Sequence, residues 1–163
     1  GLFISSKTYS SYRENYHPAY YQQLFANYGF ELQIEQSTYE LNTTLFDKPR
    51  FDILASRVMT NPRYKFEYLN FNEIEKYAGY FVEIYNKAWA FHDDFKPMEM
   101  HKLNKALKSF KPVLPPQFCI FALVDDKPAA MYLSILEVNQ VFKDFNGKLS
   151  LLNKLRFLLR RKK

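Results

Sequence analysis

The order of hydrophobic patterns between residues 64 and 136 most constrains the fold of this 163-residue chain. Residues 64–69 alternate apolar and polar side chains, which predicts a half-buried strand. Residues 72–88 and 98–110 carry apolar side chains at helical spacing, which predicts two amphipathic helices. The apolar runs at residues 118–124 and 129–136 flank a turn at residues 125–128 and predict an antiparallel hairpin. We therefore expect an α/β fold (α+β in some schemes), with helices over one face of a mostly antiparallel sheet.

The two helices should divide their side chains between core and solvent. Asn72 is a suitable N-cap for the first helix. In the second helix, lysines repeat every three residues on another face: Lys102, Lys105 and Lys108. These lysines form either a solvated surface or a stripe that binds anions. The positions expected to face inward are Ile74, Tyr77, Ala78, Phe81, Ile84, Tyr85, Ala88, Leu103, Leu107 and Phe110.

The segments before residue 64 carry shorter patterns. Pro18 can open a helix through Ala26, and Gly29 can end it in a left-handed conformation. Residues 30–39 alternate as a strand would, and residues 51–59 predict a short helix within a connector. Four tyrosines are spaced to share one helical face, as a packing stripe or a ligand-stacking surface: Tyr9, Tyr12, Tyr16 and Tyr20.

The end of the chain predicts a loop followed by a helix. Residues 139–147 have the composition of a loop, and residues 150–163 form an amphipathic pattern with a basic end. The leucines expected to face inward are Leu151, Leu152, Leu155, Leu158 and Leu159.

Composition favours a packed protein in a reducing setting. Hydrophobic residues make up 47% of the chain and aromatic residues 18%, which is enough for a core. The single cysteine, Cys119, excludes an internal disulfide and is expected to be buried. The apolar run at residues 118–124 is too short to cross a bilayer, and no signal-peptide pattern is present. We expect a cytoplasmic protein without a membrane partner.

The segment at residues 84–98 concentrates the residues best suited to recognition or chemistry. It holds the only tryptophan, Trp89, together with His92, Asp93, Asp94 and Pro97, where one helical pattern stops and the next begins. Loops held between rigid elements often carry function, because packing does not dictate their side chains. The aspartates also suit a helix-end cap.

Several classes of site are not supported by the sequence. The glycines are too few and too scattered for a phosphate-binding loop. No serine occupies a nucleophile-elbow context. His17, His92 and His101 lie in separate segments, so no metal site is predicted. The net charge is +6 and the basic residues 156–163 attract anions, but they alternate with leucines, so nucleic acid is not expected as a partner.

Specific strings in the chain resemble those of GNAT-type N-acyltransferases, particularly uncharacterised bacterial tandem-GNAT proteins. Residues 15–21 (NYHPAYY) and 28–30 (YGF) are similar to the closing helix and strand of one unit. Residues 84–89 (IYNKAW), 136–140 (LEVNQ) and 146–147 (NG) are similar to the second unit. The expected order of strand, two helices and hairpin also resembles the first half of a GNAT domain.

This resemblance implies an incomplete GNAT-like fold. It divides the chain into residues 1–45, which end a first unit, a connector at residues 46–62, and residues 63–163, which begin a second. The loop between the first two helices of such a unit contributes to the acceptor-substrate site, which implies an unknown small amine bound near Tyr85, Asn86, Trp89 and His92. Candidates for handling protons are His92, Asp93 and Glu99.

The cofactor implied by the resemblance is acetyl-CoA or another acyl-CoA. GNAT enzymes hold its pyrophosphate on a Q/R-x-x-G-x-G/A loop and the following helix N-terminus. No such string occurs here, so we expect either a chain cut short or a degenerate member, and no cofactor for this chain alone. The alternative is a non-catalytic interaction or structural module. In both cases we expect uncovered apolar surfaces to be masked by another chain, such as a second copy, by missing parts of the protein, or by residues 1–45.

Overall fold

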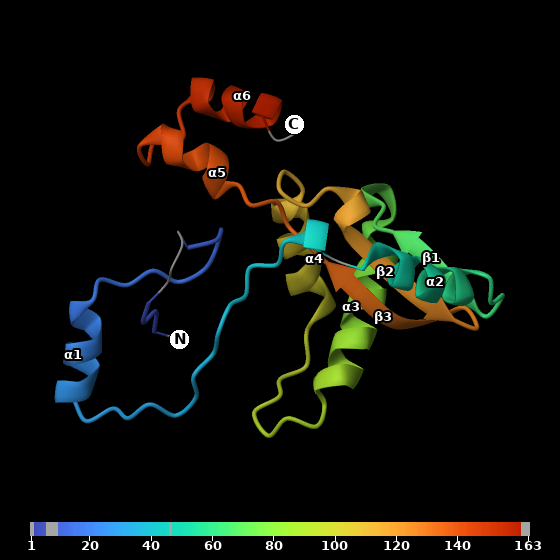
Figure 1. Cartoon of the computed structure of the whole chain (residues 1–163), viewed down its shortest axis with the longest axis horizontal. Helices are drawn as coiled ribbons and strands as arrows, with labels where there is room; N and C mark the ends of the chain where they lie inside the picture. Colours follow the sequence, from blue (N-terminus) through green and yellow to red (C-terminus); the bar gives the residue numbers. More distant parts are fainter. Residues whose placement is uncertain (1, 6–9, 46, 161–163) are drawn as a thin grey trace. The chain divides into compact units, whose positions relative to one another are not determined.

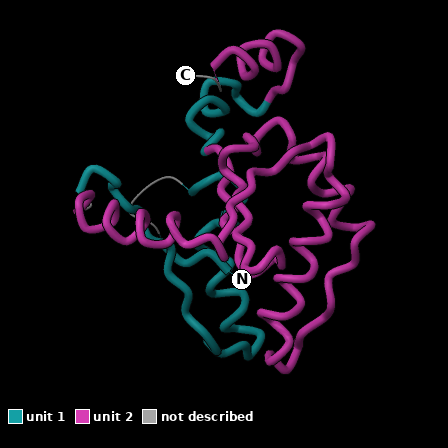
Figure 2. The backbone as a smooth tube through the Cα atoms, turned by 90° about the vertical axis from the view of Figure 1, so that its right-hand side faces the viewer, with its two compact units in different colours: residues 1–46, 137–147 teal, residues 47–136, 148–163 magenta. Residues whose placement is uncertain are grey.

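A computed structural model describes residues 2–5, 10–45 and 47–160. The chain forms two compact units, shown in Figure 2. The larger unit comprises Asp47–Leu136 and Lys148–Lys163, and the smaller comprises Gly1–Phe46 and Glu137–Gly147. The sequence-based division at residues 46 and 63 stays a prediction.

The larger unit contains a three-stranded antiparallel sheet (Figure 1). Its strands are β1 (Tyr64–Tyr68), β2 (Cys119–Val124) and β3 (Lys127–Leu133), in the order β1-β2-β3. Phe66 pairs with Ala122, which pairs with Ala130. The expected α+β fold, with all three predicted strands in one antiparallel sheet, is confirmed.

The β2–β3 turn is tighter than the sequence suggested. Asp125 and Asp126 have φ angles of 50° and 62°, as the two central residues of a type I′ hairpin turn require. Arg63 donates to Asp125 at 2.7 Å, and Lys65 pairs with Asp126. Pro128 therefore lies in β3 and not in the turn, which is tolerated because β3 is an edge strand.

Two helices pack beside the sheet, α3 (Ile74–Trp89) and α4 (Met100–Phe110). A 3₁₀ turn, η2 (Phe71–Glu73), leads into α3. The Asn70 side chain accepts from the Asn72 N–H at 3.0 Å, so the predicted N-cap at Asn72 is wrong and Asn70 fills that role before the extra turn.

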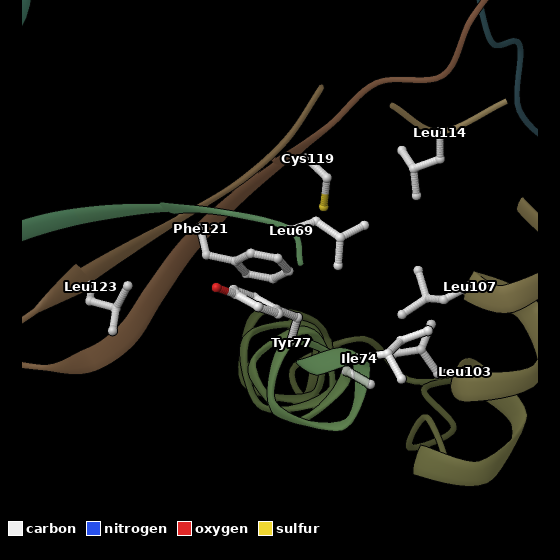
Figure 3. Close-up of a cluster of buried hydrophobic side chains, with 10 residues drawn as sticks. Leu69, Ile74, Tyr77, Leu103, Leu107, Leu114, Cys119, Phe121 and Leu123 are labelled. Atoms are coloured by element: carbon white, nitrogen blue, oxygen red, sulfur yellow. The ribbon is translucent and has the colours of Figure 1, made fainter. Parts of the chain in front are cut away.

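The core lies between the sheet and these helices (Figure 3). The Phe121 ring lies 5.4 Å from that of Tyr77 and 5.8 Å from that of Tyr80. Phe110 packs against this core, whereas Ala88 is exposed, contrary to expectation, because α3 runs past the sheet at its C-terminal end. The buried members are Leu69, Ile74, Tyr77, Ala78, Leu103, Leu107, Leu114, Cys119, Phe121 and Leu123.

Cys119 is buried, as expected, at the start of β2. Burial raises the pKa of its thiol to about 11. The protonated thiol therefore acts as a small apolar core group.

Gly79 in α3 is a position where alanine should stabilise the protein. A Cβ there would meet only the Met100 methyl, at an ordinary 3.5 Å. Glycine in a helix interior costs about 0.8–1.0 kcal/mol relative to alanine. We expect Gly79→Ala to raise the free energy of unfolding by up to that amount in urea titrations. Gly147→Ala, at a φ of 72°, is the matched control and should destabilise instead.

Helix α2 (Lys48–Met59) confirms the predicted short helix and begins earlier. The Asp47 side chain accepts from the Arg50 N–H at 3.3 Å, and Pro49 occupies the first turn. This cap moves the helix start ahead of residue 51.

In the smaller unit, α1 (Tyr20–Asn27) confirms the first predicted helix. Gly29 adopts a φ of 86°, and the Phe30 N–H donates to the Phe25 carbonyl, as in a Schellman motif. Residues 30–39 are irregular and exposed, so the predicted strand is wrong: no described segment pairs with them. The predicted tyrosine stripe is also wrong for Tyr12 and Tyr16, which lie outside any helix; Tyr9 lies outside the described residues.

The predicted loop at residues 139–147 contains helical turns, α5 (Asn139–Phe142) and the 3₁₀ turn η4 (Lys143–Phe145). The Asn139 side chain donates to the Ser10 carbonyl at 2.9 Å, and Glu137 accepts from the Tyr12 N–H at 2.8 Å. These long-range contacts, invisible in the local sequence, stabilise the segment. Phe145 is buried.

The last described helix is α6 (Leu151–Arg160). The helix was predicted, but its orientation was not: Phe157 is buried and the five leucines are exposed. Residues 161–163, which the predicted helix included, lie outside the described residues. Among the described helices, none has the length and apolar character needed to cross a membrane.

Candidate functional site

The segment that joins α3 to α4, residues 90–99, extends beyond the C-terminal end of α3 (Figure 1). Two backbone turns shape it. The His92 N–H donates to the Trp89 carbonyl at 3.1 Å, and the Phe95 N–H donates to the His92 carbonyl at 3.0 Å. We call residues 90–99 the acceptor loop, after the acceptor-substrate role that the resemblance predicts for this position.

An aromatic ladder on α3 leads to this loop. Phe81, Tyr85 and Trp89 are four residues apart, so one helical face carries all three. Their ring centroids are separated by 6.2 and 5.8 Å, with interplanar angles of 19° and 24°. The ladder begins beside the core, at Phe81, and ends at Trp89, which is about half exposed. The core therefore fixes the Phe81 end of the ladder, whereas the Trp89 end is accessible from solvent.

Rings from the loop extend the ladder. The ring centroid of Phe95 lies 6.2 Å from that of Tyr85, and the ring centroid of His92 lies 4.8 Å from that of Trp89. Phe91 lies 4.5 Å from His92 and is mostly exposed. The imidazole thus contacts two aromatic rings at the protein surface.

Asn86 holds the far end of the loop against α3. Its Oδ1 accepts from the Met98 N–H at 2.8 Å, and its Nδ2 donates to the Met98 carbonyl at 3.4 Å. Because the Met98 backbone bonds to a side chain, α4 begins at Met100 and not at residue 98 as predicted. These bonds use both the amide oxygen and the amide nitrogen of Asn86. In this structure Asn86 therefore positions the loop.

The polar side chains of the loop face solvent. Asp93, Asp94 and His92 are exposed, and none makes a side-chain hydrogen bond or ion pair with another described residue. Asp93 and Asp94 directly follow His92 in the sequence. The loop therefore combines aromatic rings with two carboxylates.

Glu99 is in a different electrostatic setting. It accepts from Lys102 Nζ at 2.6 Å and lies 3.3 Å from His101 Nδ1. The hydrogen bond from Lys102 holds the pKa of Glu99 below its usual value. Glu99 is thus a weaker base than an unpaired glutamate.

An aromatic surface next to carboxylates suits a cation. Ammonium groups bind over the faces of aromatic rings, and tryptophan binds them best. Such a cation–π contact stabilises the bound cation by about 0.5–1 kcal/mol at exposed sites. Carboxylates add Coulomb attraction that salt screens. The acceptor loop can therefore attract a protonated amine.

Metal and phosphate ligands find less support in the described residues. They contain no group of three or more His, Cys, Asp or Glu residues placed to hold a metal ion. Lys102, Lys105 and Lys108 are exposed on α4. A separate open depression near the β2–β3 turn involves the ion pairs Arg63–Asp125 and Lys65–Asp126, and none of its lining residues belongs to the acceptor loop.

The sequence pattern predicted a site at this loop but did not include all the aromatic residues that meet there. The structure brings together Tyr85, Trp89 and His92, which were predicted, with Phe81, Phe91 and Phe95, which were not assigned to the site. The four-residue spacing of Phe81, Tyr85 and Trp89 was the signal that could have revealed the ladder.

Comparisons with models of protein families, with curated proteins and with solved structures give no match to this chain.

Proposed function

We propose that this chain is part of a GNAT-like N-acyltransferase that transfers an acyl group from acyl-CoA to a small amine, and that the acceptor loop binds the amine. The order of elements supports this proposal most. One strand, two helices that pack against each other and a hairpin follow one another, and sequential strands are antiparallel neighbours. The same order characterises the first half of the family that the sequence resembles.

The amine binds over Trp89 and Phe91, with Asp93 and Asp94 attracting its positive charge. Acyl transfer then needs the neutral amine, whose nitrogen attacks the thioester carbonyl. The C–N bond forms, the C–S bond breaks, and the CoA thiol leaves. Holding amine and thioester together supplies most of the rate in such a reaction.

His92 is the candidate that takes the proton from the amine. An imidazole nitrogen can serve as a general base, and this ring contacts the ring of Trp89. Asp93 remains a second candidate, whereas the ion pair with Lys102 disfavours Glu99. Asn86 contributes by holding the loop in position, and Tyr85 contributes as a member of the aromatic ladder.

The second candidate function is a non-catalytic interaction module. The face of the sheet opposite Phe121 carries the row Tyr68, Ile120 and Tyr132, which are paired across the three strands. Tyr68 and Tyr132 are exposed, so this face suits a protein partner or a second copy.

Trp89 provides a direct test, because it is the only tryptophan in the chain. We expect small primary amines to change its fluorescence saturably, and their neutral N-acetyl forms to bind more weakly. Phe91→Ala and Asp93→Asn/Asp94→Asn should weaken the response. The matched controls Tyr28→Ala and Glu31→Gln/Glu35→Gln, which alter exposed residues elsewhere, should leave it unchanged.

The acceptor site would be rejected if the control variants lost the Trp89 fluorescence response as much as the loop variants did. It would also be rejected if no amine gave a saturable response. Self-association that Tyr68→Ser/Tyr132→Ser abolishes would then favour the interaction module.

Acetyl-CoA should not stabilise this chain by itself. Its diphosphate requires converging backbone amides, and exposed lysines without such a cradle are screened by salt. A ligand at about 100 times its Kd adds about 2.7 kcal/mol of stability. We expect no rise in Tm with millimolar acetyl-CoA at physiological salt. A reproducible rise would reveal a cofactor site in the chain.

A further inference from the structure

Helix α6 presents two different faces. Successive residues turn by about 100°, so Leu151, Leu152, Leu155, Leu158 and Leu159 fall within an arc of about 120°. Phe157 lies on nearly the opposite side and is buried, and Asn153, one turn earlier on that side, is half-buried. The Phe157 side therefore faces protein, and the leucine face, whose side chains are 43–80% exposed, faces outward.

Cations border the leucine face. Lys154 and Arg156 each lie about 40° beyond one of its edges, and both are exposed. Neither makes an ion pair with a described residue. From residue 145 onward the sequence contains seven basic residues and no acidic ones. The sequence that carries the leucines is thus strongly basic, and the described cations Lys154 and Arg156 flank the leucine face.

We propose that the leucine face of α6 binds the surface of an anionic lipid bilayer. In this arrangement the leucines enter the boundary between headgroups and acyl chains. Lys154 and Arg156 extend their aliphatic stems along the same boundary and place their charges among lipid phosphates. The helix lies in the plane of the surface and does not cross it.

Other occupants fit this face less well. Nucleic acid would use the cations but not the leucines, because its outer surface is a phosphate backbone. A second copy would bring a like-charged helix against this one. The 10-residue helix is also only about 15 Å long, too short to supply the roughly 800 Å² per partner of a standard interface. The expectation of no membrane partner rested on the lack of a long apolar run, which surface binding does not require.

Vesicle flotation with the full chain tests the leucine face. Wild type should float with phosphatidylcholine vesicles that contain phosphatidylserine. Leu152→Gln/Leu159→Gln, at positions 72% and 73% exposed, should lower the partition coefficient at least about tenfold. The control Leu32→Gln/Leu41→Gln removes leucines that are 71% and 69% exposed elsewhere and should bind as wild type does.

The charges are tested separately. Lys154→Gln/Arg156→Gln should lower binding about fivefold for each charge removed, and only with anionic vesicles. In a Trp89→Phe background, Leu155→Trp should show a blue-shifted emission on binding, and brominated lipids should quench it. Circular dichroism of each variant confirms that it is folded.

The proposal is overturned if the leucine variant and its control bind equally, or if Leu155→Trp stays unquenched while the chain floats. It is also overturned if duplex DNA of the same charge concentration displaces the chain from vesicles and binds the leucine variant as tightly as wild type. A concentration-dependent dimer that Leu152→Gln/Leu159→Gln abolishes would assign the face to self-association instead.

Discussion

Replacing Phe121 by alanine should lower the free energy of unfolding by about 3–5 kcal/mol, the usual cost of removing a buried aromatic side chain. Phe121 is 1% exposed at the centre of β2 and contacts the rings of Tyr77 and Tyr80. The substitution leaves a cavity where sheet and α3 meet, and the surrounding backbone can close it only partly. Urea titration followed by circular dichroism measures the change.

The matched control is Phe66→Ala, on the adjacent strand, where the side chain is 42% exposed. It should cost clearly less, because much of this ring already contacts water. Equal losses at the two positions would contradict the placement of the core on the Phe121 face of the sheet.

Replacing Asn86 by alanine should have the largest effect on the acceptor loop. The change removes both bonds to Met98 and leaves a half-buried backbone N–H and carbonyl without their partner. Leaving such groups unsatisfied costs about 1–3 kcal/mol. The loop should also open more often, so amide hydrogens of residues 90–99 should exchange faster and the Trp89 response to amines should weaken.

Two variants separate positioning from ligand contact. Asn86→Asp keeps an acceptor for the shorter bond and should retain part of the stability. Lys87→Ala removes only an exposed ion pair with Glu83 and should change stability by no more than about 0.5 kcal/mol. If Asn86→Ala abolished amine binding with unchanged stability and exchange, Asn86 would be a ligand contact and the positioning role would be wrong.

The larger unit could be predicted from sequence because its patterns are local and mutually consistent. The alternation in β1, the apolar run in β2 and the helical spacing in α3 and α4 place the same side chains in one core. The tight turn at Asp125 and Asp126 was only partly anticipated, since its extent depends on pairing between β2 and β3.

The failures share a physical cause. Residues 30–39 have the alternation of a strand, but a strand is stabilised by a neighbour, and no described segment pairs with this one. Residues 139–147 look like a loop but are held in helical turns by contacts with residues 10–12, which a local pattern cannot reveal.

Helix α6 shows that amphipathicity predicts a helix without stating which face meets the protein. Five leucines outweigh one phenylalanine in any pattern, yet Phe157 is the buried residue. In the acceptor loop, the sequence located Trp89 and His92, but the contacts of Asn86 with Met98 depend on how the loop returns to α3.

The most direct test of the amine-acceptor role is an isotope-filtered nuclear Overhauser measurement on the labelled chain saturated with an unlabelled primary amine. We predict contacts from the methylene protons of the amine to the ring protons of Trp89 and Phe91, with shifts confined to residues 90–99 and the end of α3. Contacts instead to the depression near Asp125 and Asp126, or none at saturating amine, would contradict it.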